Sequence, residues 1–182
     1  MSNKITKRQI SALFILMTIL IGAVVWRYVT PNQNIEKVAL EIEQIAMDIR
    51  QKYAHKIDYW GLNTQFVIDN KILTNLSYVD NEIKNALGKP VYIGRGQDGE
   101  TIMPGERSFE VVYDNLSVGE CIALASYEFK HPEEVGLLQI TIVSKKGTQT
   151  FAWGEKDHKL PISRHKAQSF CTNYAKILWT IE

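Results

Sequence analysis

The stretch GRGQDG, from Gly94 to Gly99, comes nearest to a chemical motif, because it matches the pattern G-x-G-x-x-G. In dinucleotide-binding folds these glycines open a helix whose N-terminus holds a pyrophosphate. Here the next residues are ETIMPGERSFEVVY, in which Pro104 and Gly105 precede a segment typical of a strand. No helix would be available to receive a phosphate, so we interpret Gly94 to Gly99 as a tight surface loop.

The histidines, serines and acids show no spacing that points to a catalytic or metal site. His158 and His165 are seven residues apart with Pro161 between them, so one helix could not present both as metal ligands. No serine lies in a G-x-S-x-G elbow, and the adjacent Glu133 and Glu134 are typical of a solvated loop. Catalytic groups can still assemble in space from distant residues. The sequence itself predicts no catalytic, cofactor-binding or metal-binding residue.

The totals allow one domain with a sizeable core in a chain of 182 residues. A net charge of +1, with lysines and acids interspersed, gives no signature of nucleic-acid binding. The two cysteines, Cys121 and Cys171, leave two interpretations open. In an oxidising compartment they would form a disulfide, whose loop of about 50 residues would stabilise the fold by roughly 4 kcal/mol. Otherwise they are two buried free thiols.

The N-terminal stretch KRQISALFILMTILIGAVVW predicts a membrane anchor. Its apolar run, from about Ile10 to Trp26, would span roughly 26 Å as a helix, at the short end of what crosses a bilayer. The bulky and charged end, Val24 to Tyr28, is unlike the cleavage site of a signal peptide and is typical of an interfacial anchor. We predict an uncleaved transmembrane helix over 10–28, with a cleaved signal as the alternative. The basic leader 1–9 would stay in the cytoplasm.

A linker over 29–34 precedes a strongly periodic segment, Ile35 to Ala54, which predicts a helix with one apolar stripe. This stripe could pack on the protein's own sheet, or it could contact a partner helix in a coiled coil. The candidate partner-facing residues are Ile35, Val38, Ile42, Ile45 and Ile49.

The remaining segments predict short strands and helices. PVYIG and SFEVVYDNL are typical of strands, and LLQITIVSKKGTQTFAW predicts a hairpin that turns through Lys145, Lys146 and Gly147. Ser117 and Glu120 have the spacing of a capping box. The segment SRHKAQSFCTNY can form another short helix, and KILWTIE a final strand. Together these elements predict an α+β fold in which the long helix packs on an antiparallel sheet.

Four segments resemble consecutive parts of the type IVb pilins. YWGLNTQFVIDNKI is similar to the Tyr-x-Gly-Leu segment that follows the long helix of this family, and NEIKNALGKPVYIG to its Ile-x-Asn-aromatic-Gly-Gly-x-Val-x-Val stretch. FEVVYDNLSVGECIALASYEF is similar to the strand and helix that carry the first disulfide cysteine, and AQSFCTNYAKILWTIE to the closing segment. The resemblance covers most of residues 10–182. It implies a Cys121–Cys171 disulfide, and subunits whose apolar helices bundle in a fibre core.

The chain also departs from the pilin pattern. Aligned on RQISALF, Gln9 stands where a prepilin has its cleavage-site Gly, and Phe14 stands where the mature chain has a Glu. Leu87 and Lys89 replace the aromatic residue and the second Gly of the middle motif. An uncleaved basic leader would disfavour polymerisation, because moving each cation into an apolar environment costs about 2.5–3.5 kcal/mol on insertion scales.

We therefore expect a non-catalytic pilin-like protein that is held in the bacterial inner membrane by one span, with residues 35–182 forming a periplasmic head. It would act in type IV pilus, secretion or conjugation machinery. Its partners would be pilins or assembly proteins, and it would need no cofactor and bind no nucleic acid. One alternative is a fibre subunit, processed at an atypical site, in an extracellular pilus. Another is a membrane-tethered periplasmic enzyme or ligand-binding domain.

Overall fold

The structure, a computed structural model, describes residues 17, 34–74 and 76–182. Residues Lys37–Glu182 form one compact unit. The predicted leader 1–9, span 10–28 and linker 29–34 lie outside the described residues, apart from Met17 and Asn34. None of the helices in the described part of the chain combines the length and the apolar character that a membrane crossing requires.

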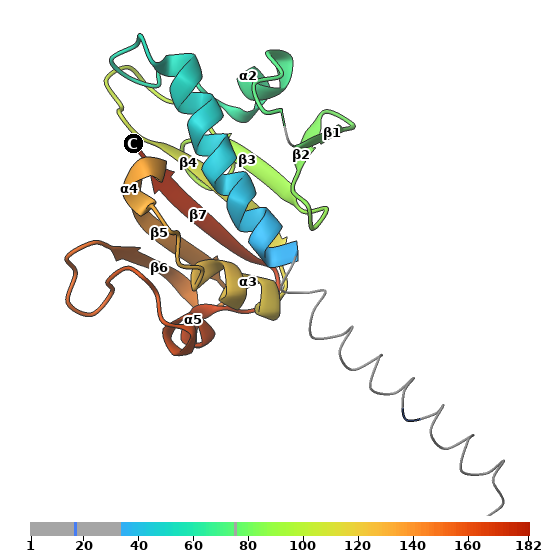
Figure 1. The fold of residues 1–182 in the computed structure, drawn as a ribbon, viewed down its shortest axis with the longest axis vertical. Coiled ribbons are helices and arrows are strands. Elements are labelled where there is room, and N and C mark those ends of the chain that lie inside the picture. Colours follow the sequence, from blue (N-terminus) through green and yellow to red (C-terminus); the bar gives the residue numbers. More distant parts are fainter. Residues whose placement is uncertain (1–16, 18–33, 75) are drawn as a thin grey trace, which may run out of the picture. The chain divides into compact units, whose positions relative to one another are not determined.

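The long helix covers residues 34–53, close to the predicted bounds. Val38, Ile42, Ile45 and Ile49 are each at most 1% exposed, whereas Ile35 is partly exposed. For these four residues the interpretation as partner-facing is therefore wrong, because their side chains are buried in the protein's own core, and it stays a prediction for Ile35. The other interpretation, that the stripe packs on the protein's own sheet, is confirmed (Figure 1).

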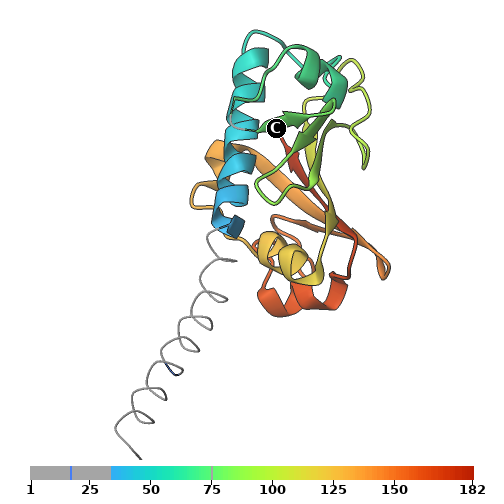
Figure 2. The same cartoon turned by 90° about the vertical axis from the view of Figure 1, so that its right-hand side faces the viewer.

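The described residues form one sheet of seven strands in the order β1-β2-β3-β4-β7-β5-β6, and every neighbouring pair is antiparallel (Figure 1). The strands are β1 (Ser77–Val79), β2 (Glu82–Lys84), β3 (Pro90–Gly94), β4 (Phe109–Leu116), β5 (Leu137–Ser144), β6 (Gly147–Ala152) and β7 (Ala175–Ile181). Figure 2 shows the long helix to one side of this sheet. The predicted α+β fold with an antiparallel sheet is confirmed.

The core lies between the helix and the inner face of the central strands. Tyr113 of β4 is fully buried, and its hydroxyl donates to the Val38 carbonyl of the helix at 3.5 Å. Trp179 of β7 packs against the Tyr113 ring, with ring centroids 5.0 Å apart. β7 is the last strand in the chain, yet it lies between β4 and β5. The final strand therefore completes the middle of the sheet.

Besides the long helix, the described residues form four short helices. They are α2 (Thr64–Asp69), α3 (Val118–Ala125), α4 (Pro132–Val135) and α5 (Arg164–Phe170). The predicted capping box is present at α3, where Ser117 Oγ accepts from the Glu120 N–H and the Glu120 carboxylate accepts from the Ser117 N–H. Cys121 of α3 and Cys171, just after α5, form a disulfide with their Cα atoms 5.8 Å apart. The disulfide that the family resemblance implied is confirmed.

The GRGQDG stretch is the turn between β3 and β4. Arg95 and Glu100 pair as an isolated bridge, which closes the residues between them into a tight turn. Gly99 has a φ of +66°, and a Cβ at this position would approach the Ile93 nitrogen to 2.9 Å. The glycine is therefore required by the local backbone geometry. The next described element is strand β4, which fits the predicted surface loop.

Candidate interaction surface

The outward side of the long helix carries apolar side chains that the core does not use. Leu40 is 51% exposed and Met47 is 54% exposed. Since they are seven residues apart, they lie almost directly above one another, two turns along the helix. With Glu43, Gln44 and neighbouring residues they line a shallow groove of about 480 Å³. We call Leu40, Met47 and this groove the outer helix face.

Glu41 lies at the border between this face and the rest of the head. Both of its carboxylate oxygens accept from the Ala86 N–H, at 3.1 Å each. Burial raises the pKa of Glu41, and the hydrogen bond from Ala86 partly opposes that rise. This contact ties the helix to the loop between β2 and β3.

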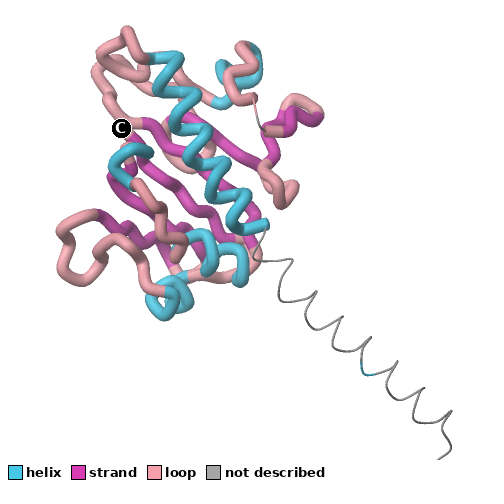
Figure 3. The backbone as a smooth tube through the Cα atoms, viewed as in Figure 1, coloured by secondary structure: helices cyan, strands magenta, loops and turns pink. Residues whose placement is uncertain are grey.

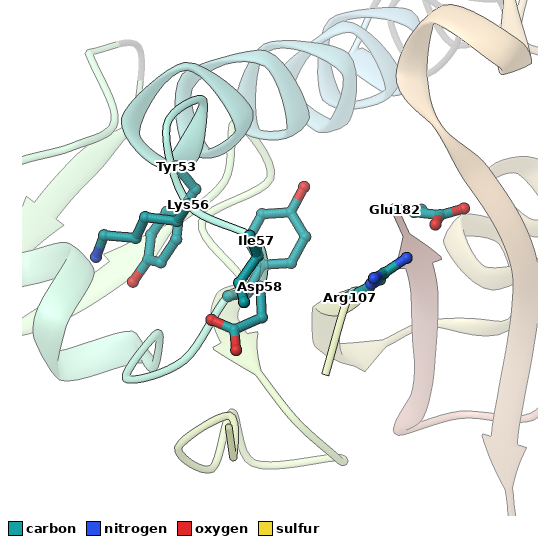
Figure 4. Close-up of a pocket in the computed structure, with 7 residues that line it drawn as sticks. Tyr53, Lys56, Ile57, Asp58, Arg107 and Glu182 are labelled. Carbon is teal, nitrogen blue, oxygen red and sulfur yellow. The ribbon is translucent and has the colours of Figure 1, made fainter. Parts of the chain in front are cut away.

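A second surface lies where the long helix ends. Tyr53, the last helical residue, and the loop that follows it line a hollow of about 370 Å³, together with Arg107 and Glu182 (Figure 4). The complete lining consists of Tyr53, Lys56, Ile57, Asp58, Tyr59, Arg107 and Glu182. Cations and acids are both present, so the hollow has no single sign of charge.

Exposed apolar side chains lie in the hollow, at Ile57, and in neighbouring loop positions, at Trp60 and Met103. Ile57 is 86% exposed, Trp60 is 62% exposed and Met103 is 54% exposed. Two loops hold these residues near one another, because the Gly61 N–H donates to the Ile102 carbonyl at 3.1 Å. We call Ile57, Trp60, Met103 and the hollow the helix-end surface. Large apolar side chains that stay exposed in a folded domain often mark a protein contact, and Trp is frequent among the residues that dominate such contacts.

The two tyrosines of the hollow are neutral at physiological pH. Burial raises the pKa of Tyr53, and Asp58 raises it further. Burial also raises the pKa of Tyr59, with Arg50 opposing the rise and Glu182 adding to it. The two rings pack with centroids 5.3 Å apart, and the Lys56 Nζ lies 4.3 Å from the Tyr53 ring centroid. The floor of the hollow is therefore an aromatic cluster that is stabilised by packing.

The described residues contain no group of three or more His, Cys, Asp or Glu side chains placed to hold a metal ion. His131 lies beside Glu133 and Glu134, whereas the His158 ring packs on Phe151. The structure brings the two predicted cysteines together.

A Ser-x-x-Lys spacing at Ser163 and Lys166, which the sequence analysis missed, has a structural explanation. The Ser163 hydroxyl accepts from the Lys166 backbone N–H and caps α5, and the Lys166 Nζ lies 6.0 Å from the Phe170 ring centroid.

Comparison with known families gives this geometry a context. The family model described as Bundlin matches residues 29–177. The chain belongs to the Bundlin family. These are the type IVb pilins, the family that the sequence segments resembled. The chain matches no curated protein.

Two solved structures have a similar fold. The type IVb pilin from Salmonella typhi is 13% identical, with a TM-score of 0.50, and the match covers 78% of this chain and 95% of the other. TcpA, a type IV pilin from the El Tor biotype of Vibrio cholerae, is 12% identical, with a TM-score of 0.54 and coverage of 82% and 99%. At this level of identity the likeness establishes the pilin fold.

Sequence reasoning found the disulfide but missed the exposed residues of both surfaces. The available signal was helical phase, because Leu40 and Met47 fall opposite the buried stripe at 3.6 residues per turn. Ile57, Trp60 and Met103 gave no such signal, since exposure in a loop follows no period.

Proposed function

We propose that this chain is a non-catalytic, inner-membrane-anchored pilin-like protein that works in type IV pilus, secretion or conjugation machinery. Residues 10–28 would form the membrane anchor, and the head would contact other pilins or assembly proteins in the periplasm. The family and the fold support a pilus-related role. The apolar run, with Lys7 and Arg8 before it, supports the anchor and its orientation.

The outer helix face is the observation that carries this proposal. The inner face of the helix is already used by the protein's own core, whereas about half of the surface of Leu40 and of Met47 stays exposed and available for another contact. Apolar side chains at this spacing provide the i and i+7 anchors that a second helix can contact. The function therefore lies in contacts made by the helix, and we assign it no reaction.

Site-specific photo-crosslinking in native membranes tests these contacts. A photoreactive phenylalanine analogue is placed in the full chain at position 40 or 47, and at position 138 as a control. Leu138 is also partly exposed, at 39%, but it lies on strand β5. We expect positions 40 and 47 to crosslink to a protein with a pilin fold or to a pilus-assembly protein, and position 138 to do so far less. Equal yields at all three positions would contradict the proposal.

The fold shared with fibre-forming pilins also favours a second candidate function, that of a fibre subunit trimmed at an atypical site. The intact mass of the chain, purified from membranes and from sheared pili, separates the two. A retained Met1 to Arg8 segment supports the anchored protein, whereas a trimmed chain in sheared pili supports the fibre subunit.

A further inference from the structure

Positive charge gathers around α5. From residue 158 to residue 181 the sequence contains neither Asp nor Glu. This segment includes Arg164 and Lys166 of α5, and the turn between β5 and β6 adds Lys145 and Lys146. The turn lies against the last residues of α5, because the Lys146 Nζ donates to the Ser169 carbonyl at 2.8 Å.

An exposed aromatic side chain lies beside these cations. Tyr174 is 72% exposed, and the Lys145 Nζ lies 5.8 Å from its ring centroid. The partly exposed Val118 is close by, because its N–H donates to the side chain of Asn173 at 3.3 Å. Tyrosine rings next to lysine or arginine are typical of the boundary between a bilayer and water. The surface is defined by four cations and this ring, and we name it the basic end: Lys145, Lys146, Arg164, Lys166 and Tyr174.

The basic end lies where the long helix begins. Tyr174 precedes Ala175, which pairs with Leu116 at the start of β7. The other end of β7 leads to Glu182, which lines a hollow with Tyr53, the last residue of the long helix. α3 and α5 accordingly lie at the end of the head that contains the first turns of the long helix (Figure 2, Figure 3).

The acids at this end of the head do not neutralise the basic end. The Glu120 carboxylate caps α3 and lies 3.9 Å from the Lys89 Nζ, and Asp114 lies 3.3 Å from the Lys176 Nζ. Glu36, at the start of the long helix, is exposed and is followed by a lysine. Within 34–74 and 76–182, none of the cations of the basic end forms a salt bridge.

We propose that the basic end is a docking surface for the anionic phospholipid headgroups of the membrane that anchors the chain. This inference rests on the anchor in the proposed function. The predicted linker 29–34 could reach at most about 20 Å even if fully extended, so an anchored head keeps this end closest to the bilayer. Anionic lipids attract lysine and arginine over a Debye length, which is about 8 Å at physiological ionic strength. Docking would restrict the tumbling of the head above the membrane.

Fluorescence quenching in vesicles tests the docking. The full chain is reconstituted into phosphatidylcholine vesicles, with or without phosphatidylglycerol, that contain a trace of lipid with a nitroxide on its headgroup. A hydrophilic fluorophore is attached to Gln168→Cys, at an exposed position of α5. The matched control is Gln51→Cys, an exposed glutamine near the end of the long helix. Cys121 and Cys171 are already joined, so they do not react with the label.

We expect phosphatidylglycerol to raise the quenching at position 168 about threefold and to leave the quenching at position 51 unchanged. Salt at about 1 M should reverse the increase, because the Debye length falls to about 3 Å. Lys145→Gln combined with Arg164→Gln should remove most of the increase. Lys52→Gln combined with Lys71→Gln removes the same charge from exposed positions around the far end of the long helix and should not change it.

Flotation of the same vesicles at high salt separates this inference from the anchor. A chain that floats with the vesicles, but whose labels at positions 168 and 51 respond equally to phosphatidylglycerol, overturns the docking alone. A chain that high salt removes from the vesicles overturns the anchor, and the docking with it. An increase at position 168 that survives the loss of the Lys145 and Arg164 charges would also overturn the docking.

Discussion

Glu110 lies on the outer face of β4, in a row of polar side chains that crosses the sheet. Its carboxylate accepts from the Gly96 N–H and is bonded by the Thr180 side chain, and the Thr180 Oγ1 in turn accepts from Gln139 Nε2 at 3.1 Å. Burial nevertheless raises the pKa of Glu110, because the hydrogen bonds do not fully offset the loss of water. Hydrogen bonds along this row therefore link β5, β7, β4 and the turn after β3. Glu110 is the titratable group in the row.

This raised pKa predicts a pH-dependent stability. A carboxyl group whose pKa is higher in the folded chain binds more protons folded than unfolded. Its contribution is therefore fully present below the ordinary value of 4.5 and is lost as the pH rises through the folded pKa. Glu110→Gln can still accept from the Gly96 N–H. We expect it to make the free energy of unfolding depend less on pH in the range that begins near pH 4.5. Urea unfolding of the detergent-solubilised chain at several pH values measures this.

The exposed Glu133→Gln controls for the loss of one negative charge. A Glu110→Gln profile as steep as that of the unchanged protein would contradict the expectation.

At the scale of elements, the disulfide joins α3 to the segment that connects α5 with β7. It closes a sequence separation of 50 residues, which contains β5, β6 and α5. In the chain-entropy model the disulfide stabilises the folded state because it restricts the conformations of this loop in the unfolded chain. The bond therefore stabilises the region that includes β5 and β6.

We expect Cys121→Ser and Cys171→Ser each to lower the free energy of unfolding by about 2–5 kcal/mol, the usual range for a native disulfide. The double variant should lose about as much as either single one, because the same bond is removed. Thermal unfolding with and without reductant checks this. Equal melting temperatures in the two conditions would show that the bond does not stabilise the head.

Local patterns predicted most of the elements, because their signals are contained in short segments. The strand at Pro90–Gly94, the hairpin through Lys145 and Lys146, and the capping box at Ser117 all lie where the sequence indicated. The β1–β2 hairpin was missed, because each strand has only three residues and too few to show alternation. Its turn residues Asp80 and Asn81 have positive φ angles of 51° and 63°. The signal in the sequence was the Asp-Asn pair itself, because these residue types tolerate the positive φ angles of a tight hairpin turn.

The order of the strands could not be predicted in the same way, because pairing between distant segments leaves no local pattern. The sequence likewise predicted an apolar stripe on the long helix, but which surface it contacts depends on tertiary packing. Val38, Ile42, Ile45 and Ile49 meet the chain's own sheet. The residues left for a partner, Leu40 and Met47, follow only once that packing is known.

Over the whole molecule, the two sides of the long helix should respond differently to substitution. Ile42→Ala leaves a cavity between the helix and the sheet, so we expect a loss of about 2–5 kcal/mol in the free energy of unfolding. Leu40→Ala removes a half-exposed side chain, and its effect should stay within about 0.5 kcal/mol. Chemical denaturation of both variants measures the contrast. A large loss from Leu40→Ala would mean that the outer helix face belongs to the core.

The central position of β7 also governs when the head can mature. Until residues 175–181 have emerged, β4 and β5 have no strand between them, and the sheet exists only as two unjoined halves. A nascent or prematurely terminated chain therefore cannot finish its hydrophobic interior, whatever its earlier segments have formed. A chain that stops before residue 175 is therefore expected not to form a stable sheet.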